Sequence, residues 1–142
     1  MIANPSIIIV EDEDLIQAML ACEFEDGGFT VAQATNVEQA IFLLDRPGAE
    51  YRALVTDIRL GHAGMAGWDV ARHAREINPR TPVVYIGGDS ECDWAARGVP
   101  NSIMIPKPFV PAQVLSAISR LMSPRTTRGP GWMTRPIGMN PV

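Results

Sequence analysis

The sequence IIIVEDE at residues 7–13 joins a wholly apolar, β-branched run to a group of acidic residues. A short, continuous apolar run of this kind, here starting at Ser6 after Pro5, is typical of a strand buried on both faces of a parallel sheet. Glu11 and Asp12 follow the run directly, so we expect them at the carboxyl end of the strand. This one stretch therefore predicts both an α/β fold and an acidic site at the edge of its sheet.

The rest of the chain alternates apolar segments of strand length with segments of helical periodicity. Thr35 followed by Glu38 has the pattern of a capping box at the start of the second helix, and Pro111 fits the first turn of the last helix. Five strand–helix repeats predict a doubly wound parallel sheet with helices on both faces. Strands are expected at 6–10, 29–34, 51–56, 82–86 and 102–105, and helices at 13–26, 35–44, 68–77, 89–96 and 111–122.

The composition is that of a water-soluble globular protein, with 46% hydrophobic and 20% charged residues. We expect one domain over residues 1–122, followed at 123–142 by a tail rich in Pro, Gly and Arg. Such a tail is expected to be disordered, with packing as an arm on a neighbour as the alternative. A span needs roughly 20 apolar residues, and none is found; nor does the N-terminus have the pattern of a signal peptide. A cytoplasmic protein without a membrane partner is therefore expected, and the net charge of −4 argues against a nucleic-acid partner.

Charged residues and glycines follow the other predicted strands. Asp57 follows the third, Gly87 and Gly88 the fourth, and Lys107, the only lysine of the chain, the fifth. Ligands of doubly wound sheets bind beyond the carboxyl ends of the strands, so these groups are expected to meet the acidic doublet there. Carboxylates brought together repel unless a cation joins them, and hard oxygen ligands suit Mg²⁺. Lys107 can balance one charge and hold a phosphoryl oxygen.

Four segments, IIIVEDE, LVTDIRL, PVVYIGG and IPKPF, resemble in order and spacing the motifs of response-regulator receiver domains. The resemblance covers roughly residues 6–122 and implies a flavodoxin-like (βα)₅ sheet of strand order 2-1-3-4-5. It also implies that Asp57 accepts a phosphoryl group from a sensor histidine kinase or a histidine phosphotransfer protein. The remaining site residues that it implies are Lys107 as the phosphoryl contact and, around Mg²⁺, Glu11, Asp12, Asp57 and the backbone carbonyl of Arg59.

Two positions depart from the pattern of that family. Gly87 stands where receiver domains usually carry Ser or Thr, whose hydroxyl binds a phosphoryl oxygen, and Met104 stands where they usually carry Tyr or Phe. We therefore expect a backbone N–H of Gly87 or Gly88 to make the phosphoryl contact. A switch driven by a hydroxyl group is not expected.

The loops around the acceptor are altered as well. Gly61 stands where proline is common, and the next residue, His62, is expected to be an exposed loop residue, with a role in gating access as the alternative. Arg59 and Asp89 occupy positions that help to set the phosphoryl lifetime in this family, so their opposite charges are expected to form a lid that slows hydrolysis. The short segment before the last strand predicts a stunted fourth helix.

These observations predict a stand-alone receiver, a monomer or weak homodimer, that relays a signal through protein–protein interaction. It would be a phospho-acceptor with self-catalysed phosphoryl transfer and hydrolysis, not a classified enzyme. The alternative is a degenerate receiver that binds partners without phosphate, as Gly87 and Met104 suggest. A haloacid-dehalogenase-type phosphatase would also carry a nucleophilic aspartate, and Asp12 and Asp14 match its DxD pattern, but its later acidic pair and cap insertion are absent. Glu13 and Asp14 otherwise fit the acidic preference of a helix N-terminus.

Overall fold

The computed structural model describes residues 6–61, 66–88 and 91–123, and the side chains of Glu91 and Cys92 are not part of that description. The predictions for His62, for Asp89 and for the tail beyond Ser123 therefore lie outside the described residues. The strands are β1 (Ser6–Val10), β2 (Thr30–Ala34), β3 (Ala53–Asp57), β4 (Val83–Gly87) and β5 (Ser102–Pro106). The helices are α1 (Asp14–Asp26), α2 (Val37–Asp45), α3 (Gly67–Ile77), α4 (Glu91–Arg97) and α5 (Pro111–Met122).

The five strands form one parallel sheet in the order β2-β1-β3-β4-β5, which confirms the predicted flavodoxin-like topology. The register brings the carboxyl ends of the central strands to one level. Val10 pairs with Thr56, Asp57 pairs with Ile86, and Gly87 pairs with Pro106. Residues that follow these strands therefore start from the same edge of the sheet.

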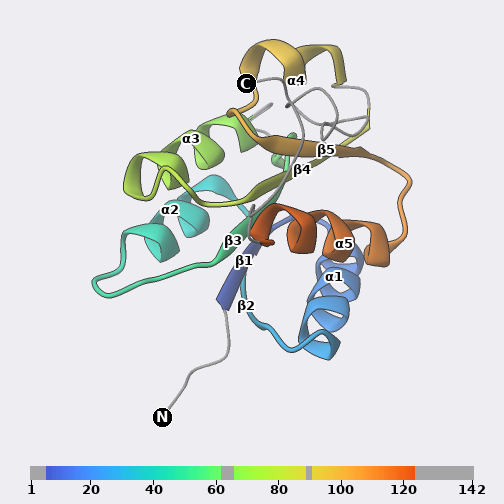
Figure 1. The fold of residues 1–142 in the computed structure, drawn as a ribbon, viewed down its shortest axis with the longest axis horizontal. Coiled ribbons are helices and arrows are strands. Elements are labelled where there is room, and N and C mark those ends of the chain that lie inside the picture. The colour runs from blue at the N-terminus through green and yellow to red at the C-terminus, as the bar shows by residue number, and fades with distance from the viewer. Residues whose placement is uncertain (1–5, 62–65, 89–90, 124–142) are drawn as a thin grey trace.

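Helices cover both faces of the sheet, with α1 and α5 side by side on one face and α2 and α3 on the other (Figure 1). Successive residues of β1 supply both cores. Ile7 and Ile9 pack in the cluster that contains Phe24 of α1, whereas Ile8 and Val10 pack in the cluster on the opposite face. This two-sided burial is why β1 is apolar at every position and does not alternate.

The predicted elements are all present, but one predicted cap is wrong by one residue. The N-cap of α2 is Asn36, whose side chain accepts a hydrogen bond from the backbone N–H of Gln39. The side chain of Gln39 in turn accepts from the backbone N–H of Thr35, the residue before the cap. The Thr35–Glu38 pattern gave the wrong cap because the next residue, Asn36, is at least as good an N-cap as Thr. The helix before β5 is short, as predicted, with seven residues.

The start of α3 lies directly against the end of β3. The backbone N–H of Gly67 donates to the carbonyl of Ile58 at 2.9 Å, which ties the helix to the strand that carries Asp57. A Cβ at Gly67 would collide with the Asp57 carbonyl oxygen and lie 2.8 Å from Cα of Ile58. Glycine is needed here because backbone meets backbone, which leaves no side chain that could move aside.

Gly67→Ala is expected to lower the free energy of unfolding by about 2 kcal/mol, since the added methyl forces α3 away from β3. Gly88→Ala is the matched control, because a Cβ there meets nothing within 4 Å. That control is expected to change stability by less than about 0.5 kcal/mol. Urea unfolding of the three proteins tests this, and equal stability of the two variants would contradict the close approach.

Candidate functional site

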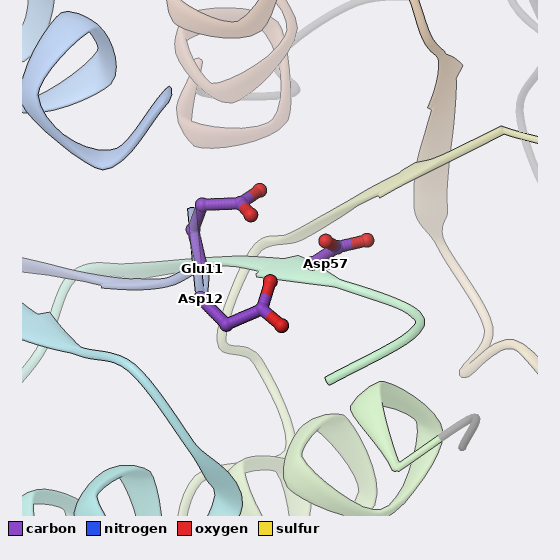
Figure 2. Close-up of side chains that lie close together, drawn as sticks. All are labelled: Glu11, Asp12 and Asp57. Atoms are coloured by element: carbon purple, nitrogen blue, oxygen red, sulfur yellow. The ribbon is translucent and has the colours of Figure 1, made fainter. Parts of the chain in front are cut away.

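The carboxyl edge of the sheet gathers the acidic residues that the sequence predicts. Glu11 and Asp12 leave the end of β1, Asp57 ends β3, and their side chains turn toward a common space (Figure 2). One carboxylate oxygen from each residue lies within 4.8 Å of the other two. The three residues come together because β1 and β3 are hydrogen-bonded neighbours in the parallel sheet and end at the same level, with Val10 paired to Thr56.

Asp57 is a buried acid of this cluster. It is 4% exposed, and its Oδ2 accepts a hydrogen bond of 3.1 Å from Nζ of Lys107. Burial raises the pKa of the Asp57 carboxyl, and Lys107 opposes the shift by stabilising the ionised form. The Asp57 side chain thus lies at the end of a buried strand with the ammonium group of Lys107 beside it.

Lys107 is shared among carboxylates. Besides Asp57, its Nζ lies 3.7 Å from Oε1 of Glu11 and 3.7 Å from Oε1 of Glu13. Burial lowers the pKa of the ammonium group, but attraction to these carboxylates outweighs burial, so the pKa is raised overall. The backbone N–H of Lys107 donates to the carbonyl of Gly87 at 2.7 Å, which fixes the segment after β5 against the end of β4.

Glu11 is a fully buried carboxyl group. Its Oε2 accepts a hydrogen bond from the backbone N–H of Glu13 at 3.0 Å, whereas its Oε1 has no hydrogen-bond partner. Burial, and next the charge of Asp57, raises the pKa of Glu11 to about 8. Near neutral pH, therefore, Glu11 retains a proton unless a further cation joins the cluster.

Asp12 is the exposed member of the cluster and is held from across the site. Its Oδ2 accepts a hydrogen bond of 2.9 Å from the backbone N–H of Gly61, in the segment after β3. Gly61 has a φ of +55°. Proline has no N–H and a φ near −65°, so it could make neither the contact nor the turn. This explains the glycine at a position where proline is common.

The donor set fits Mg²⁺. All three side chains offer carboxylate oxygens, the hard ligands that this cation prefers. The buried Oε1 of Glu11 accepts no hydrogen bond and lies 3.7 Å from Nζ of Lys107, so it is an acceptor that a cation would satisfy. A cation would also offset the burial and the repulsion by Asp57 that raise the pKa of Glu11. Arg59 follows Asp57 by two residues at the same edge, and the role of its carbonyl stays a prediction.

The two glycines after β4 differ in their surroundings. A Cβ on Gly87 would lie 2.9 Å from Cδ1 of Ile58 and 3.2 Å from Cε of Met104, so these two side chains fill the space beside it. Gly88 is exposed, with open space where its Cβ would be. The structure thus places Gly87 at the end of β4, the strand that pairs with β3, with apolar atoms where a hydroxyl is expected from the resemblance to receiver domains. A phosphoryl contact from either glycine stays a prediction.

The sequence analysis did not identify Gln17, which holds the main chain at Glu11 by hydrogen bonds. This side chain of α1 is 4% exposed, and its amide nitrogen lies within hydrogen-bond distance of three carbonyls, those of Ile9, Glu11 and Ala34. It thereby joins the end of β1 to the end of β2. The sequence does contain a sign of this role. Gln17 is a polar residue on the inner side of a predicted amphipathic helix, and a buried amide needs hydrogen-bond partners.

A family model described as the response regulator receiver domain matches residues 7–119 of this chain. Among curated relatives, the sensor kinase CckA of Brucella abortus is 25% identical over 122 residues, which cover 84% of this chain and 13% of that protein. The putative response regulator NtrX-like of Rickettsia conorii is 29% identical over 105 residues, covering 72% of this chain and 22% of that protein. The chain thus spans less than a quarter of the length of either relative.

Solved structures share the fold. A response regulator receiver protein from Sinorhizobium medicae is 40% identical, with a TM-score of 0.78, and the match covers 83% of this chain and 94% of that one. The receiver domain of the sensor histidine kinase PA1611 from Pseudomonas aeruginosa, solved with a magnesium ion in its active-site cleft, is 22% identical, with a TM-score of 0.71 over 84% of this chain and 98% of that one. Among the described helices of this chain, none has the length and apolar character needed to cross a membrane.

Glu11→Gln is expected to stabilise the cation-free protein, and more so at pH 8.5 than at pH 5. The folded state of the parent keeps the Glu11 proton up to a pKa of about 8, while the unfolded state releases it near 4.5. Stability of the parent therefore falls as the pH rises between these values, and a neutral amide avoids the loss. Thermal unfolding in EDTA at both pH values measures the difference.

Adding Mg²⁺ in the same experiment is expected to raise the melting temperature of the parent and to have less effect on Glu11→Gln. The cation favours the ionised carboxylate, and its binding to the folded state alone shifts the unfolding equilibrium. A variant whose stability gain is independent of pH would contradict the raised pKa of Glu11.

Proposed function

The chain belongs to the response regulator receiver domain family, and we propose that it accepts a phosphoryl group on Asp57 and passes the signal on by binding other proteins. One observation carries the proposal: the buried Asp57 carboxylate lies against Lys107, in a cluster with the two carboxylates that follow β1. A buried aspartate with one cation and two further acids beside it has the parts that phosphoryl transfer needs.

In the proposed step, a carboxylate oxygen of Asp57 forms a bond to phosphorus while the phosphorus–nitrogen bond of a phosphohistidine breaks. The imidazole departs with the electron pair of that bond. Lys107, already 3.1 Å from Oδ2 of Asp57, holds a phosphoryl oxygen after transfer and offsets its charge. Mg²⁺, held by Glu11, Asp12, Asp57 and the carbonyl of Arg59, supplies charge neutralisation for the carboxylates and phosphoryl oxygens when it is bound.

The product is an acyl phosphate, which water hydrolyses to regenerate the aspartate and inorganic phosphate. Since the chain itself is the acceptor and returns to its starting state through its own site, we propose a phospho-acceptor with self-catalysed transfer and hydrolysis and not a classified enzyme. The contact on the far side of the phosphoryl group is proposed to come from a backbone N–H of Gly87 or Gly88, because neither residue carries a hydroxyl group.

The proposed phosphodonor is a sensor histidine kinase or a histidine phosphotransfer protein. Relatives that match this chain include the sensor kinases CckA and LuxN, which associates such domains with kinases. Three large apolar residues are exposed on the neighbouring helices α1 and α5: Leu15 and Met19 of α1 are 72% and 40% exposed, and Val110, the N-cap residue of α5, is 60% exposed. Since α1 starts two residues after Asp12 and Val110 comes three residues after Lys107, we propose that they form one apolar patch near the acidic site. Large exposed apolar residues beside a reactive group favour docking of a protein over capture of a free metabolite.

We further propose that the domain works on its own in the cytoplasm, as a monomer or weak homodimer, with protein partners and without binding to nucleic acid or membrane. The net charge of −4 supports this choice of partner, since phosphate backbones and anionic lipid surfaces repel an acidic protein.

A second function, phosphate-independent binding of a partner, is favoured by one observation. Ile58 and Met104 fill the space beside Gly87, and Gly87 has no hydroxyl side chain that could move and bind a phosphoryl oxygen. A domain of this kind would keep its acidic cluster as a site for Mg²⁺.

Incubation with acetyl phosphate and Mg²⁺ is expected to add one phosphoryl group to the parent, measured as intact-protein mass. Asp57→Asn is expected to show no addition, because an amide is not a nucleophile for this reaction. The parent in EDTA is also expected to show no addition. Absence of uptake by the parent, with histidine kinases present as well, would reject phosphoryl acceptance in favour of phosphate-independent binding.

Leu15→Gln is expected to slow phosphoryl transfer from a phosphorylated histidine kinase about tenfold, since a buried leucine contributes roughly 1.5 kcal/mol or more to an interface. The kinase used is the one that labels the parent fastest. Phe42→Gln, a matched change of a residue 69% exposed on α2, is expected to transfer normally. Both variants should accept phosphate from acetyl phosphate at the parent rate, and a general defect of Leu15→Gln would remove the support for docking at this patch.

A further inference from the structure

The side chain of Glu13 takes no part in the chemistry proposed above, yet it lies at the site. Its Oε1 is 3.7 Å from Nζ of Lys107, and the side chain is 63% exposed at the rim of the acidic cluster. Its backbone N–H meanwhile holds Oε2 of Glu11. Glu13 is therefore joined to the site twice, through the main chain to a buried acid and through the side chain to the lysine.

A role in helix capping does not account for this side chain. Glu13 is the N-cap residue of α1, but it makes no side-chain capping hydrogen bond. The sequence pattern predicts an acidic residue that serves the helix N-terminus, and in the structure its carboxylate lies beside Lys107 instead. The adjacent Asp14, in the first turn of α1, is the acid that fits the helix dipole.

We propose that Glu13 is a specificity-determining residue that disfavours small anionic phosphodonors and leaves the site to a donor that docks as a protein. The inference rests on the phosphoryl-accepting function proposed above. Glu13 adds an exposed carboxylate beside the acids Glu11, Asp12 and Asp57, and it shares Lys107 with Glu11 and Asp57. An anionic donor that approaches from solvent meets this excess negative charge first.

The two kinds of donor differ in what offsets the repulsion. A small acyl phosphate brings only its charges to the rim, so repulsion by Glu13 reduces its occupancy of the site. A protein donor gains binding energy away from the charges, at the apolar patch of Leu15, Met19 and Val110. The same carboxylate therefore discriminates between donors without touching the reacting atoms.

Glu13 also restrains Lys107 until the phosphoryl group arrives. An ion pair with a carboxylate that is 63% exposed is weak, so a phosphoryl oxygen on Asp57 readily takes over the ammonium group. Loss of Glu13 removes both the repulsion and this competitor, and the two effects act in the same direction on small anionic donors.

The test compares initial rates of phosphorylation by acetyl phosphate in Glu13→Gln and Asp14→Asn, which remove the same charge from adjacent residues. Glu13→Gln is expected to react about threefold faster than the parent, the effect expected for one exposed ion pair. Its rate should also depend less on salt, because the parent rate rises with ionic strength as repulsion is screened. Glu13→Asp keeps the charge and should keep the salt dependence of the parent.

Transfer from a phosphorylated histidine kinase is expected to rise less in Glu13→Gln than the acetyl phosphate rate does, because docking offsets the repulsion for a protein donor. The ratio of the two donor rates is therefore expected to shift toward acetyl phosphate. Equal rates of Glu13→Gln and Asp14→Asn with acetyl phosphate, in a parent that does take up phosphate, would overturn the inference and leave the proposed function intact. No uptake by the parent at all would instead reject the proposed function.

A second measurement tests the contact without phosphorylation. Lys107 is the only lysine of the chain, so ¹⁵N-lysine labelling gives one side-chain Nζ signal in NMR spectra. That signal is expected to shift in Glu13→Gln and to stay in place in Asp14→Asn. An unchanged signal in Glu13→Gln would overturn the proposed hold on Lys107 whatever the kinetics show.

Discussion

Repulsion among carboxylates at one edge of a parallel sheet is the constraint on which the rest of the site depends. β1 and β3 are neighbours in register, so Glu11 and Asp57 cannot separate without breaking the core that buries both strands. Burial is the main reason that the pKa values of these two carboxyl groups are raised, and the charge of Asp57 adds to the rise at Glu11. Lys107, from the far edge strand, relieves part of the repulsion. The repulsion that remains would favour the binding of a cation.

The sequence predicts this much because strand burial is a local pattern. A continuous apolar run marks a strand covered on both faces, and its last residue marks the sheet edge to within a residue or two. Residues directly behind a run, such as Glu11, Asp57 and Lys107, are therefore placed correctly without any knowledge of tertiary contacts. The strand order followed from the resemblance of four motifs, and the observed order β2-β1-β3-β4-β5 is the one that the resemblance implies.

The features that the sequence did not predict all depend on contacts between distant segments or on a choice between neighbours. The N–H of Gly61 reaches a carboxylate 49 residues earlier in the chain, and Gly67 is needed only because a helix start lies on the acceptor strand. Asn36 and Thr35 are both good caps, and only the path of the chain from β2 decides between them. From the sequence, Glu13 likewise fits an acidic residue at a helix N-terminus, and only the structure shows that it lies beside Lys107.

The apolar packing beside Gly87 limits which parts of the site can move when its occupancy changes. Ile58 and Met104 are buried in the cluster that also holds Tyr85 and Trp94, so a movement there would disturb a packed core. The contacts at the rim are different in kind: Asp12 with Gly61, and Lys107 with Glu13, each join an exposed carboxylate to a group that faces the site. The proposed cation would draw on Asp12 at the rim as well as on the buried Glu11 and Asp57, and the proposed phosphoryl group would draw on Lys107. We therefore expect a change of state at Asp57 to act first on the segment after β3, through Asp12 and Gly61, and on the start of α1, through Lys107 and Glu13, two residues before the exposed Leu15.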